Sequence, residues 1–570
     1  MTSSLFVPLA PFVIFYLGAL LIAVTRNRVR QAVMLAIPLI GAWNLYAMPA
    51  DTVIGVQVFD YTLSLFQADR LSLLFGYLFH LAAFLGAIYA IKVTDNSELI
   101  GSFMYAGSAL GAVFTGDMIT LFVFWEMLAV TSVFLVLARR TERSQQAAMR
   151  YIIIQVLSGV ILLAGVLLRV HDTGSIAFGH IGLDGTLASK LILLAIGIKC
   201  AFPLLHNWLT DAYPEATPTG TVFLSAFTTK VAVYALARSY AGTELLVPIG
   251  AAMAMFPIFY ATIENDLRRV LSYSMINQIG FMVVGIGLGT EMAINGAIAH
   301  AFNDVIFKAL LLMSMGAVLH RTGKINGSDL GGLYKSMPKT ALFCIIGAAS
   351  ISAVPLFSGF VSKSMIMVAA LEEGHGMIWL LLLFASAGVM EHAGIKIPYF
   401  AFFAHDSKIR CKEAPTNMLI AMGLAAAISI FIGVYPWALY SVLPFPVEYA
   451  PFTAPHVMTQ MQLLLFSALA FAVLKLTHIY PPELPGVNID AEWSYRMALP
   501  KAVGLFKKTF GPLDRAVRKT ALGLVNSAIG AVFRLHGPTG VMARTTLVGS
   551  MVQWVVVLLA VYLVLFMIGD

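Results

Sequence analysis

Long apolar stretches separated by short polar loops make up most of the chain. Each stretch is about 20 residues long, which is the length at which an α-helix crosses a bilayer, and there are about sixteen of them. They cover residues 4–25, 31–49, 70–92, 99–115, 117–138, 146–169, 188–212, 217–240, 243–263, 269–289, 291–318, 340–370, 376–403, 416–437, 459–480 and 546–568. The pattern predicts an all-α polytopic membrane protein.

The composition supports this fold class. Of the 570 residues, 59% are hydrophobic and 11% are charged, and the mean hydropathy is +0.86, whereas a typical soluble domain is about 25% charged. The first span has neither a basic segment before it nor a small-residue cleavage site after it. We therefore expect it to be a transmembrane helix of the mature protein and not a signal peptide.

The basic residues lie mainly in loops that follow odd-numbered spans. These residues are Arg26, Arg28, Arg30, Lys92, Arg139, Arg140, Arg143, Arg268, Arg269, Arg321, Lys324, Lys335, Lys339, Lys408, Arg410 and Lys412. Loops after even-numbered spans contain little beyond Arg70, Lys190 and Arg238. The positive-inside rule then predicts that both termini lie outside the cytoplasm. The net charge of +7 follows from this topology and does not indicate nucleic-acid binding.

The three cysteines, Cys200, Cys344 and Cys411, are far apart and form no CxxC pair. They provide neither a disulfide framework nor a ligand set for a metal ion or an iron–sulfur cluster. We therefore expect no metal and no cofactor in this chain, and no electron transfer through it.

Residues 481–545 differ from the rest because basic residues are interspersed among apolar ones. Pro500 and the Gly511–Pro512 pair are expected to divide this segment into helical pieces, the longest over residues 513–535. A basic amphipathic helix of this kind lies in the membrane interface or along a partner protein, and the pattern fits both. The final span, residues 546–568, follows it.

Ionisable residues occur inside several spans, although a charge at the bilayer centre costs about 2.5 to 3.5 kcal/mol. The residues are Glu126, Lys199, Lys230, His300, Lys308, Lys363, Glu391 and Lys396. A single lysine of this kind can simply reach the membrane surface or brace the packing through a fixed ion pair. A whole series of such residues favours a path for protons.

Two proline residues interrupt the helices beside buried lysines. Pro203 follows Lys199 by four residues and removes the hydrogen bond that the Lys199 carbonyl would accept. Pro355 lies shortly before Lys363 and is followed by Ser358 and Gly359. Interrupted helices in transporters often line the transport pathway.

His300, Asp304 and Lys308 recur at intervals of four residues, so they share one face of the eleventh span. A lone histidine is usually a packing residue. With an acid and a base on the same face, we favour a proton relay over about two helical turns.

The pattern also suggests an internal repeat. Spans four to eight, residues 99–240, and spans nine to thirteen, residues 243–403, each place an interrupted helix fourth and end with a lysine before an aromatic-rich run. Because five is odd, the second unit would be inverted relative to the first, an arrangement found in transporters. The remaining regions are residues 1–98, 416–480, 481–545 and 546–568.

Four segments resemble the antiporter-like subunits of respiratory complex I, membrane-bound hydrogenases and Mrp-type sodium/proton antiporters. The segments are residues 122–127 (FVFWEM), 197–238 (from GIKCAFPLLHNWL), 264–281 (ENDLRRVLSYSMINQIGF) and 299–318 (AHAFNDVIFKALLLMSMGAV). The resemblance is greatest to the D-type component of Mrp antiporters. It implies that Glu126 pairs with Lys199 and that Lys230, His300, Lys308 and Lys363 continue a proton path.

The chain departs from the family pattern at two places. Asp304 replaces a histidine that usually follows the asparagine of the eleventh-span motif, so a carboxylate would carry the proton there or the step would be altered. The two spans beyond the fourteenth, joined by the amphipathic segment, resemble the longer distal subunit of complex I with its lateral helix.

These features predict a subunit of the bacterial cytoplasmic membrane that moves protons, without a redox centre of its own, together with other membrane subunits. The first interpretation is a Mrp-type antiporter that exchanges a monovalent cation, Na⁺, for protons. The alternatives are the proton-pumping arm of a redox complex, whose partner subunits carry the electrons, and a scaffold that transports nothing.

Overall fold

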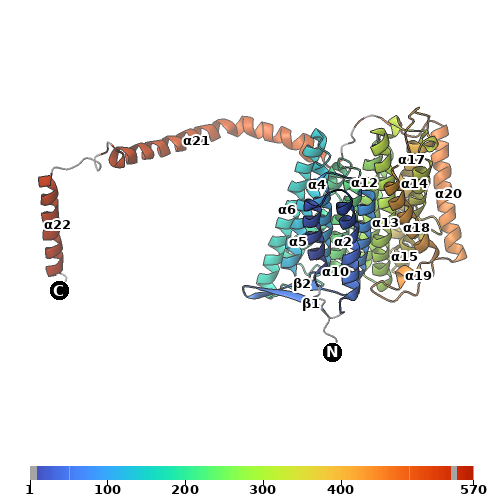
Figure 1. Ribbon diagram of the computed structural model, residues 1–570, viewed down its shortest axis with the longest axis horizontal. Helices are drawn as coiled ribbons and strands as arrows, with labels where there is room; N and C mark the ends of the chain where they lie inside the picture. Colours follow the sequence, from blue (N-terminus) through green and yellow to red (C-terminus); the bar gives the residue numbers. More distant parts are fainter. Residues whose placement is uncertain are drawn as a thin grey trace. The chain divides into compact units, whose positions relative to one another are not determined.

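The computed structural model describes residues 9–49, 52–484, 486, 488, 490–538, 540 and 548–568. It contains two compact units, Met1–Asp490 and Ala491–Asp570. The first unit is a bundle of helices with one short β-hairpin among its described residues (Figure 1).

The bundle begins with α1 (Pro11–Val24), α2 (Asn27–Ala47) and α3 (Arg70–Tyr89). Between α2 and α3, the strands β1 (Val53–Val58) and β2 (Tyr61–Gln67) pair antiparallel, with a register shift between Ile54 and Gly55. Most of the hairpin is exposed, in keeping with its mixture of β-branched and polar residues.

The two predicted five-span units follow. The helices of the first are α4 (Asn96–Phe114), α5 (Met118–Leu137), α6 (Glu142–Thr173), α7 (Leu187–Lys199), α8 (Asn207–Ala212), α9 (Gly220–Ala226) and α10 (Thr228–Tyr240). Those of the second are α11 (Leu246–Ile263), α12 (Leu267–Leu288), α13 (Glu291–Thr322), α14 (Pro338–Ile351), α15 (Ser358–Glu372) and α16 (Gly376–Val389). The last continues through η3 (Met390–Ile395), α17 (Lys396–Pro398) and η4 (Tyr399–Phe403), where η3 and η4 are π-helical.

Two short 3₁₀ turns, η1 (Gly327–Asp329) and η2 (Leu333–Lys335), precede α14. After the second unit come α18 (Thr416–Val434), α19 (Trp437–Tyr440) and α20 (Ala454–Leu476). A helix, or a run of consecutive helices, thus lies over each predicted span, although residues 4–8 and 546–547 of these spans fall outside the described residues.

Within the described residues, 11 helices are long and apolar enough to cross a membrane. Two shorter apolar helices, Pro11–Val24 and Pro338–Ile351, accompany them. The predicted fold class, an all-α polytopic membrane protein, is therefore confirmed.

The two five-span units have matching elements. Asp117 caps α5 and Asp266 caps α12, and each forms an isolated β-bridge with the loop that follows the next helix. Those next helices, α6 and α13, both have 32 residues and both end at a glycine with φ of 69°. A residue with a side chain would be strained in this left-handed conformation.

The interruptions of the two units match as well. Ala201 and Leu204 flank Pro203 with φ of 61° and 69°, and Ala353 and Leu356 flank Pro355 with φ of 57° and 75°. Non-glycine residues rarely adopt positive φ, and each costs about 1 kcal/mol or more. The same strained geometry at both interruptions supports the predicted repeat.

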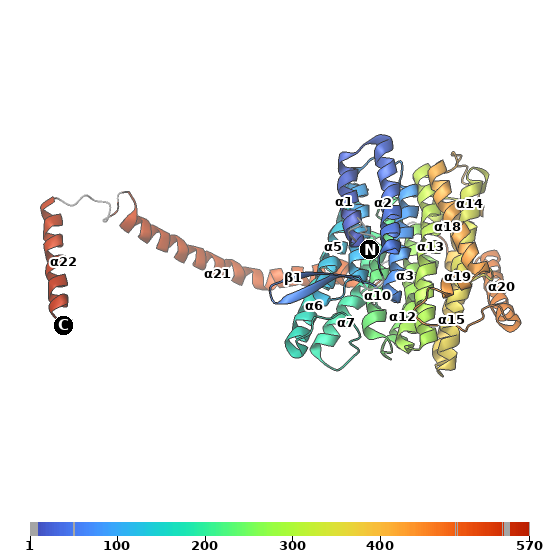
Figure 2. The same cartoon turned by 60° about the horizontal axis from the view of Figure 1, so that its bottom comes forward.

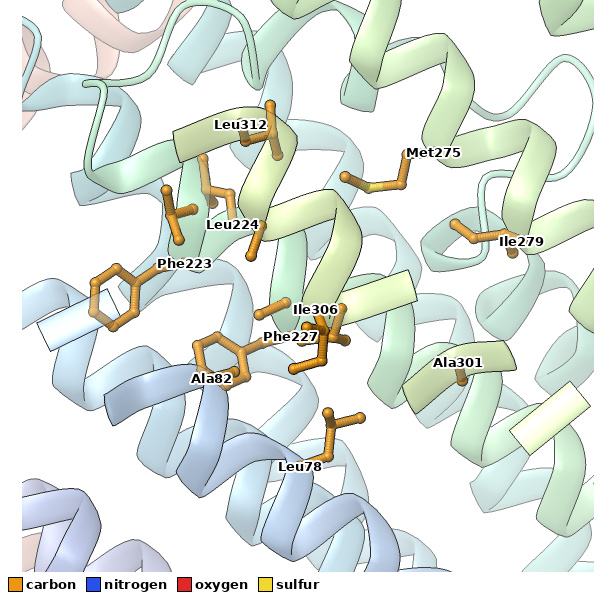
Figure 3. Close-up of a cluster of buried hydrophobic side chains, with 14 of the residues drawn as sticks. Leu78, Ala82, Phe223, Leu224, Phe227, Met275, Ile279, Ala301, Ile306 and Leu312 are labelled. Atoms are coloured by element: carbon orange, nitrogen blue, oxygen red, sulfur yellow. The ribbon is translucent and has the colours of Figure 1, made fainter. Parts of the chain in front are cut away.

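The helices that carry Lys230, His300, Asp304 and Lys308 are largely or wholly covered by protein. The most apolar 18-residue stretches of Gly220–Tyr240 and Leu267–Leu288 are wholly buried inside the bundle, and that of Glu291–Thr322 is 89% buried. α13 packs against α9, α12, α14, α15 and α18. Figure 3 shows part of this core, where Phe223 and Leu224 of α9 lie near Ile306 of α13. Ionisable side chains on these helices are thereby kept away from lipid.

The second unit contains η5 (Ser494–Ala498), α21 (Leu499–His536) and α22 (Val548–Ile568). The expected division at Gly511–Pro512 is wrong, because α21 continues through Pro512 as one helix (Figure 2). A proline removes only one backbone hydrogen bond, and the intact bonds on both sides preserve the helix. Pro500, by contrast, lies in the first turn of α21, where proline is well tolerated.

Candidate functional site

Lys199 is the last residue of α7 and is completely buried. Its ammonium donates a hydrogen bond to the Trp125 carbonyl at 2.5 Å and lies 4.6 Å from the centre of the Trp125 ring. Trp125 precedes Glu126 on α5, so the structure brings the predicted pair together. The Lys199 and Glu126 charges act on one another without forming a close ion pair within the described part of the chain.

The Glu126 carboxylate packs against Gly159 of α6. Its Oε1 atom is buried and has no hydrogen-bond partner among the described residues. A Cβ atom built at Gly159 would overlap the Glu126 side chain. The absence of a side chain at position 159 therefore provides the space that Glu126 occupies.

Replacing Gly159 with alanine is expected to reduce ion transport about tenfold or more, because the new methyl group would displace the Glu126 carboxylate. Transport by the intact complex in membrane vesicles is the measurement. Gly423→Ala is the control, since a Cβ atom there meets only Phe343 at 3.4 Å. Normal transport in Gly159→Ala would contradict the importance of the Glu126 position.

An ion pair occupies the centre of the bundle. Lys230 of α10 lies 2.6 Å from Asp304 of α13, and both side chains are 0% exposed. Lys230 also donates a hydrogen bond to the Ser225 carbonyl at 3.2 Å. The chain enters this region through the bend at Phe227 between α9 and α10, an interruption that contains no proline.

Asp304 influences more than one lysine. Its charge acts on Lys308, one turn further along α13, and on Lys363 of α15. The Lys308 ammonium donates to the Ser274 hydroxyl of α12 at 3.0 Å. Asp304 is therefore a shared counter-charge for three buried lysines.

His300 connects α13 with two neighbouring helices. Its Nδ1 atom is 3.0 Å from the Ser362 hydroxyl of α15, and its Nε2 atom is 3.0 Å from the Gln278 side-chain oxygen of α12. Gln278 in turn donates a hydrogen bond to the side-chain oxygen of Asn277, and Asn277 donates one to the Ala254 carbonyl. His300, Asp304 and Lys308 are all buried on α13, as the four-residue spacing predicts.

Lys363 has surroundings like those of Lys199. Its ammonium donates to the carbonyl of Ile351, the last residue of α14, at 3.1 Å and lies 4.9 Å from the centre of the Phe281 ring. The proline interruption exposes such carbonyls because they lack their usual helical partners. Each of these two lysines thus contacts a backbone carbonyl and an aromatic ring, although only the Ile351 carbonyl lies at a helix interruption.

Lys396 has different contacts. Its ammonium donates to the carbonyls of Ala261, Thr262 and Glu264 at 3.2, 2.7 and 2.7 Å, and it pairs with Glu483 at 3.1 Å. These carbonyls lie at the end of α11, so Lys396 caps that helix. The structure does not bring Lys396 into the Asp304 cluster.

The sequence pattern did not single out His392, which is completely buried in the π-helix η3. Its charge interactions include Lys308, Lys363 and Lys396. The signal was present, since His392 and Lys396 repeat the four-residue spacing seen on α13. π-Helical turns are often retained at functional sites.

A buried hydroxyl cluster was also missed. The Tyr105 hydroxyl is 2.6 Å from the Thr228 hydroxyl beside Lys230, and the Tyr151 hydroxyl is 2.7 Å from that of Ser132 on α5. These residues come from four helices, and no regular spacing in the sequence relates them.

Residues 115–390 match a family model described as "NADH:quinone oxidoreductase/Mrp antiporter, TM". Hydrogenase-4 component B of Escherichia coli (strain K12) is 28% identical over 410 residues, which cover 62% of this chain and 61% of that protein. The A component of the Na(+)/H(+) antiporter of Alkalihalophilus pseudofirmus is 30% identical over 419 residues, covering 65% of this chain and 52% of that protein. The chain thus spans between half and two thirds of these two relatives.

The fold is also that of solved membrane subunits. A chain in the Mrp complex from Dietzia sp. DQ12-45-1b matches with a TM-score of 0.69 and 22% identity, covering 80% of this chain and 99% of that one. A chain in the archaeal membrane-bound sulfane sulfur reductase matches with a TM-score of 0.71 and 21% identity, covering 97% of this chain and 99% of that one. A chain of respiratory complex I from Thermus thermophilus has a TM-score of 0.69 at 18% identity.

The sequence, the fold and these matches define the class of protein. Residues 115–390 match that family model, and the matched relatives are named as components of a hydrogenase and of a Na(+)/H(+) antiporter, which confirms the antiporter-like membrane subunit family predicted from the sequence.

Proposed function

We propose that the chain is a proton-translocating membrane subunit of a multisubunit Mrp-type antiporter, which exchanges a monovalent cation, Na⁺, for protons. The observation that carries the proposal is the fully buried Lys230–Asp304 pair, whose carboxylate also acts on Lys308 and Lys363. Three lysines that share one carboxylate cannot all be charged at low cost, because unpaired charges in a membrane protein interior are expensive. Protons can therefore redistribute among them.

The proposed path begins at Glu126 and Lys199, continues to Lys230 and Asp304, and proceeds through Lys308 and His300 to Lys363. Lys199 is free to exchange partners because its ammonium is held by a carbonyl and an aromatic ring and not by a close carboxylate. A shift of Glu126 toward Lys199 would favour the charged amine, and a shift away would favour proton release. His300 has a hydrogen-bond partner at each ring nitrogen, which suits a group that accepts a proton on one side and donates it on the other.

Lys396 has a structural role in the proposal. Its contacts with three carbonyls and Glu483 favour a role in holding the end of α11 against the segment after α20. His392 would be its link to the Asp304 cluster.

Replacing Lys396 with methionine is expected to destabilise the complex by about 3 to 5 kcal/mol, because Glu483 and the α11 carbonyls would lose a buried counter-charge. Thermal unfolding of the purified complex measures this loss. Lys408→Met, at an exposed loop position, should have no comparable effect. If the Lys396→Met complex were stable but had lost transport, the structural role would be contradicted and Lys396 would belong to the proton path.

We further propose a bacterial cytoplasmic membrane location, both termini on the non-cytoplasmic side, and other membrane subunits as partners. The topology is supported by the basic residues, which lie mainly in loops after odd-numbered spans. The partners are supported by the relatives, since the matched protein of Alkalihalophilus pseudofirmus is named as part of a Na(+)/H(+) antiporter.

The pumping arm of a redox complex is the second candidate. One observation favours it: the match to the sulfane sulfur reductase chain covers 97% of this chain, more than residues 1–490 can supply. That match therefore extends into the unit that contains α21 and α22.

Purification of the intact complex in mild detergent, with identification of its subunits by mass spectrometry, separates the candidates. Small hydrophobic partners and Na⁺-dependent proton flux in proteoliposomes would support the antiporter. Partners with flavin, iron–sulfur or nickel sites would instead establish the redox pump. Undiminished ion flux in Lys199→Ala would favour a scaffold.

A further inference from the structure

A small cavity lies beside Lys363. It has a volume of about 70 Å³, and its polar lining consists of Lys363 and Ser364 of α15 and His456, Thr459 and Gln460 of α20. A single water needs roughly 10 to 15 Å³ measured in this way, so the cavity has room for several waters. Lys363 itself is 1% exposed, which makes this cavity its route to water.

His456 is a titratable residue of this cavity that the proposed path does not use. Its Nδ1 atom donates to the Pro451 carbonyl at 2.7 Å, and its ring stacks on Phe360 with centroids 4.6 Å apart. Because Nδ1 carries the proton, Nε2 of the neutral ring remains a proton acceptor. Gln460, one turn further along α20, donates to the carbonyl of Ser352 at the second interruption at 3.4 Å.

A larger acidic pocket lies nearby, which we name the vestibule. It has a volume of about 580 Å³ and is lined by Glu291, Glu372, Glu448 and Tyr449, among others. Glu291 is the first residue of α13, whereas Arg321 lies at the other end of that helix. The lining residue Glu291 therefore places the vestibule at the end of α13 opposite Arg321 and its basic loop. Three carboxylates in one pocket raise the local concentration of cations, including protons.

Tyr449 connects the vestibule with the cavity. It lines the vestibule, and its hydroxyl lies 3.5 Å from His456 Nδ1. The same hydroxyl interacts with Ser364, which lines the cavity, and Glu372 of the vestibule acts on it electrostatically. One side chain thus touches groups of both hollows.

We propose that the vestibule, Tyr449, His456 and the cavity form the proton portal of Lys363 on the face opposite the basic loops. The inference rests on the proposed function and identifies where the proposed proton path opens to water. The neutral His456 ring takes one proton at Nε2 from a water molecule and becomes imidazolium. It then releases one proton to a cavity water, which passes a proton to the neutral Lys363 amine, and no electrons move. The reverse sequence releases a proton from Lys363.

Chemical rescue tests the role of His456. In vesicles containing the whole complex, His456→Ala should reduce proton flux at least tenfold, and imidazole added on the vestibule side should restore it. Pyrazole, a ring of the same shape and a much weaker base, should not. His405→Ala, at an exposed loop histidine, should retain full flux. Full flux in His456→Ala, or a loss that imidazole does not restore, would overturn the proposal.

Water access is tested independently of proton flux through His456. In a Cys411→Ser background, Thr459→Cys should be bound by Ag⁺ added on the vestibule side, and Ser386→Cys, at a fully buried position of α16, should not. Ag⁺ binding only from the opposite side, or at neither cysteine, would overturn the portal. If the unmodified complex moved no protons while Ag⁺ bound Thr459→Cys, the proposed function would fail and the water-filled opening would remain.

Discussion

Lys230→Met is expected to abolish proton flux and to destabilise the complex by about 3 to 5 kcal/mol. Asp304 would be left as a charged group without its partner at a position that is 0% exposed, and the removal of one member of a buried pair has costs of this size. Flux in proteoliposomes and thermal unfolding of the complex are the two measurements. Arg518→Met is the matched control, because it breaks an exposed Arg518–Asp514 pair in α21 that contributes less than about 1 kcal/mol.

The double variant Lys230→Met with Asp304→Leu separates structure from transport. Removing both charges should restore part of the lost stability, since apolar residues often replace a buried ion pair at little cost, although Lys308 and Lys363 then lack the shared carboxylate. Proton flux should remain absent, because the shared carboxylate and one lysine of the path are both missing. Recovery of flux together with stability would mean that the pair serves the fold alone.

Lys199→Ala and Glu126→Ala are each expected to abolish transport while the complex still assembles. Lys199 forms no close ion pair in the described residues, so its loss leaves no tightly paired counter-charge behind. A unit charge about 4 Å away, at an effective dielectric constant of about 20, is worth about 4 kcal/mol. Movement of Glu126 is therefore enough to determine whether Lys199 keeps its proton, and without either residue that control is lost.

Flux and the set of co-purifying proteins in the two variants test this second prediction, with Lys190→Met at an exposed position of the same helix as the control. Normal flux in either alanine variant would remove the pair from the path. Loss of partner proteins would show that the residue supports assembly instead.

Much of the fold could be predicted because membrane insertion leaves a strong signal in sequence. Backbone groups must be satisfied within each span, so every crossing needs a long apolar helix, and the sixteen predicted spans follow from this requirement. The prediction failed at Pro512, because a local rule for proline does not include the intact hydrogen bonds on either side of it. His392 was missed because the pattern of charges in its span drew attention to Glu391 and Lys396 instead. The Tyr105–Thr228 contact was missed because the two residues are distant in sequence.

Apolar length, charge and proline act locally, so the amino-acid order was enough to establish a multi-span membrane protein with buried lysines beside interrupted helices. Segments such as residues 197–238 were also enough to identify the family. Which charges meet could be learned only from the packed helices. Packing pairs Lys230 with Asp304, uses Gly159 to make space for Glu126, and directs Lys396 to the end of α11. Interactions between charges depend on distances of a few ångströms across different helices, and helix packing alone sets those distances.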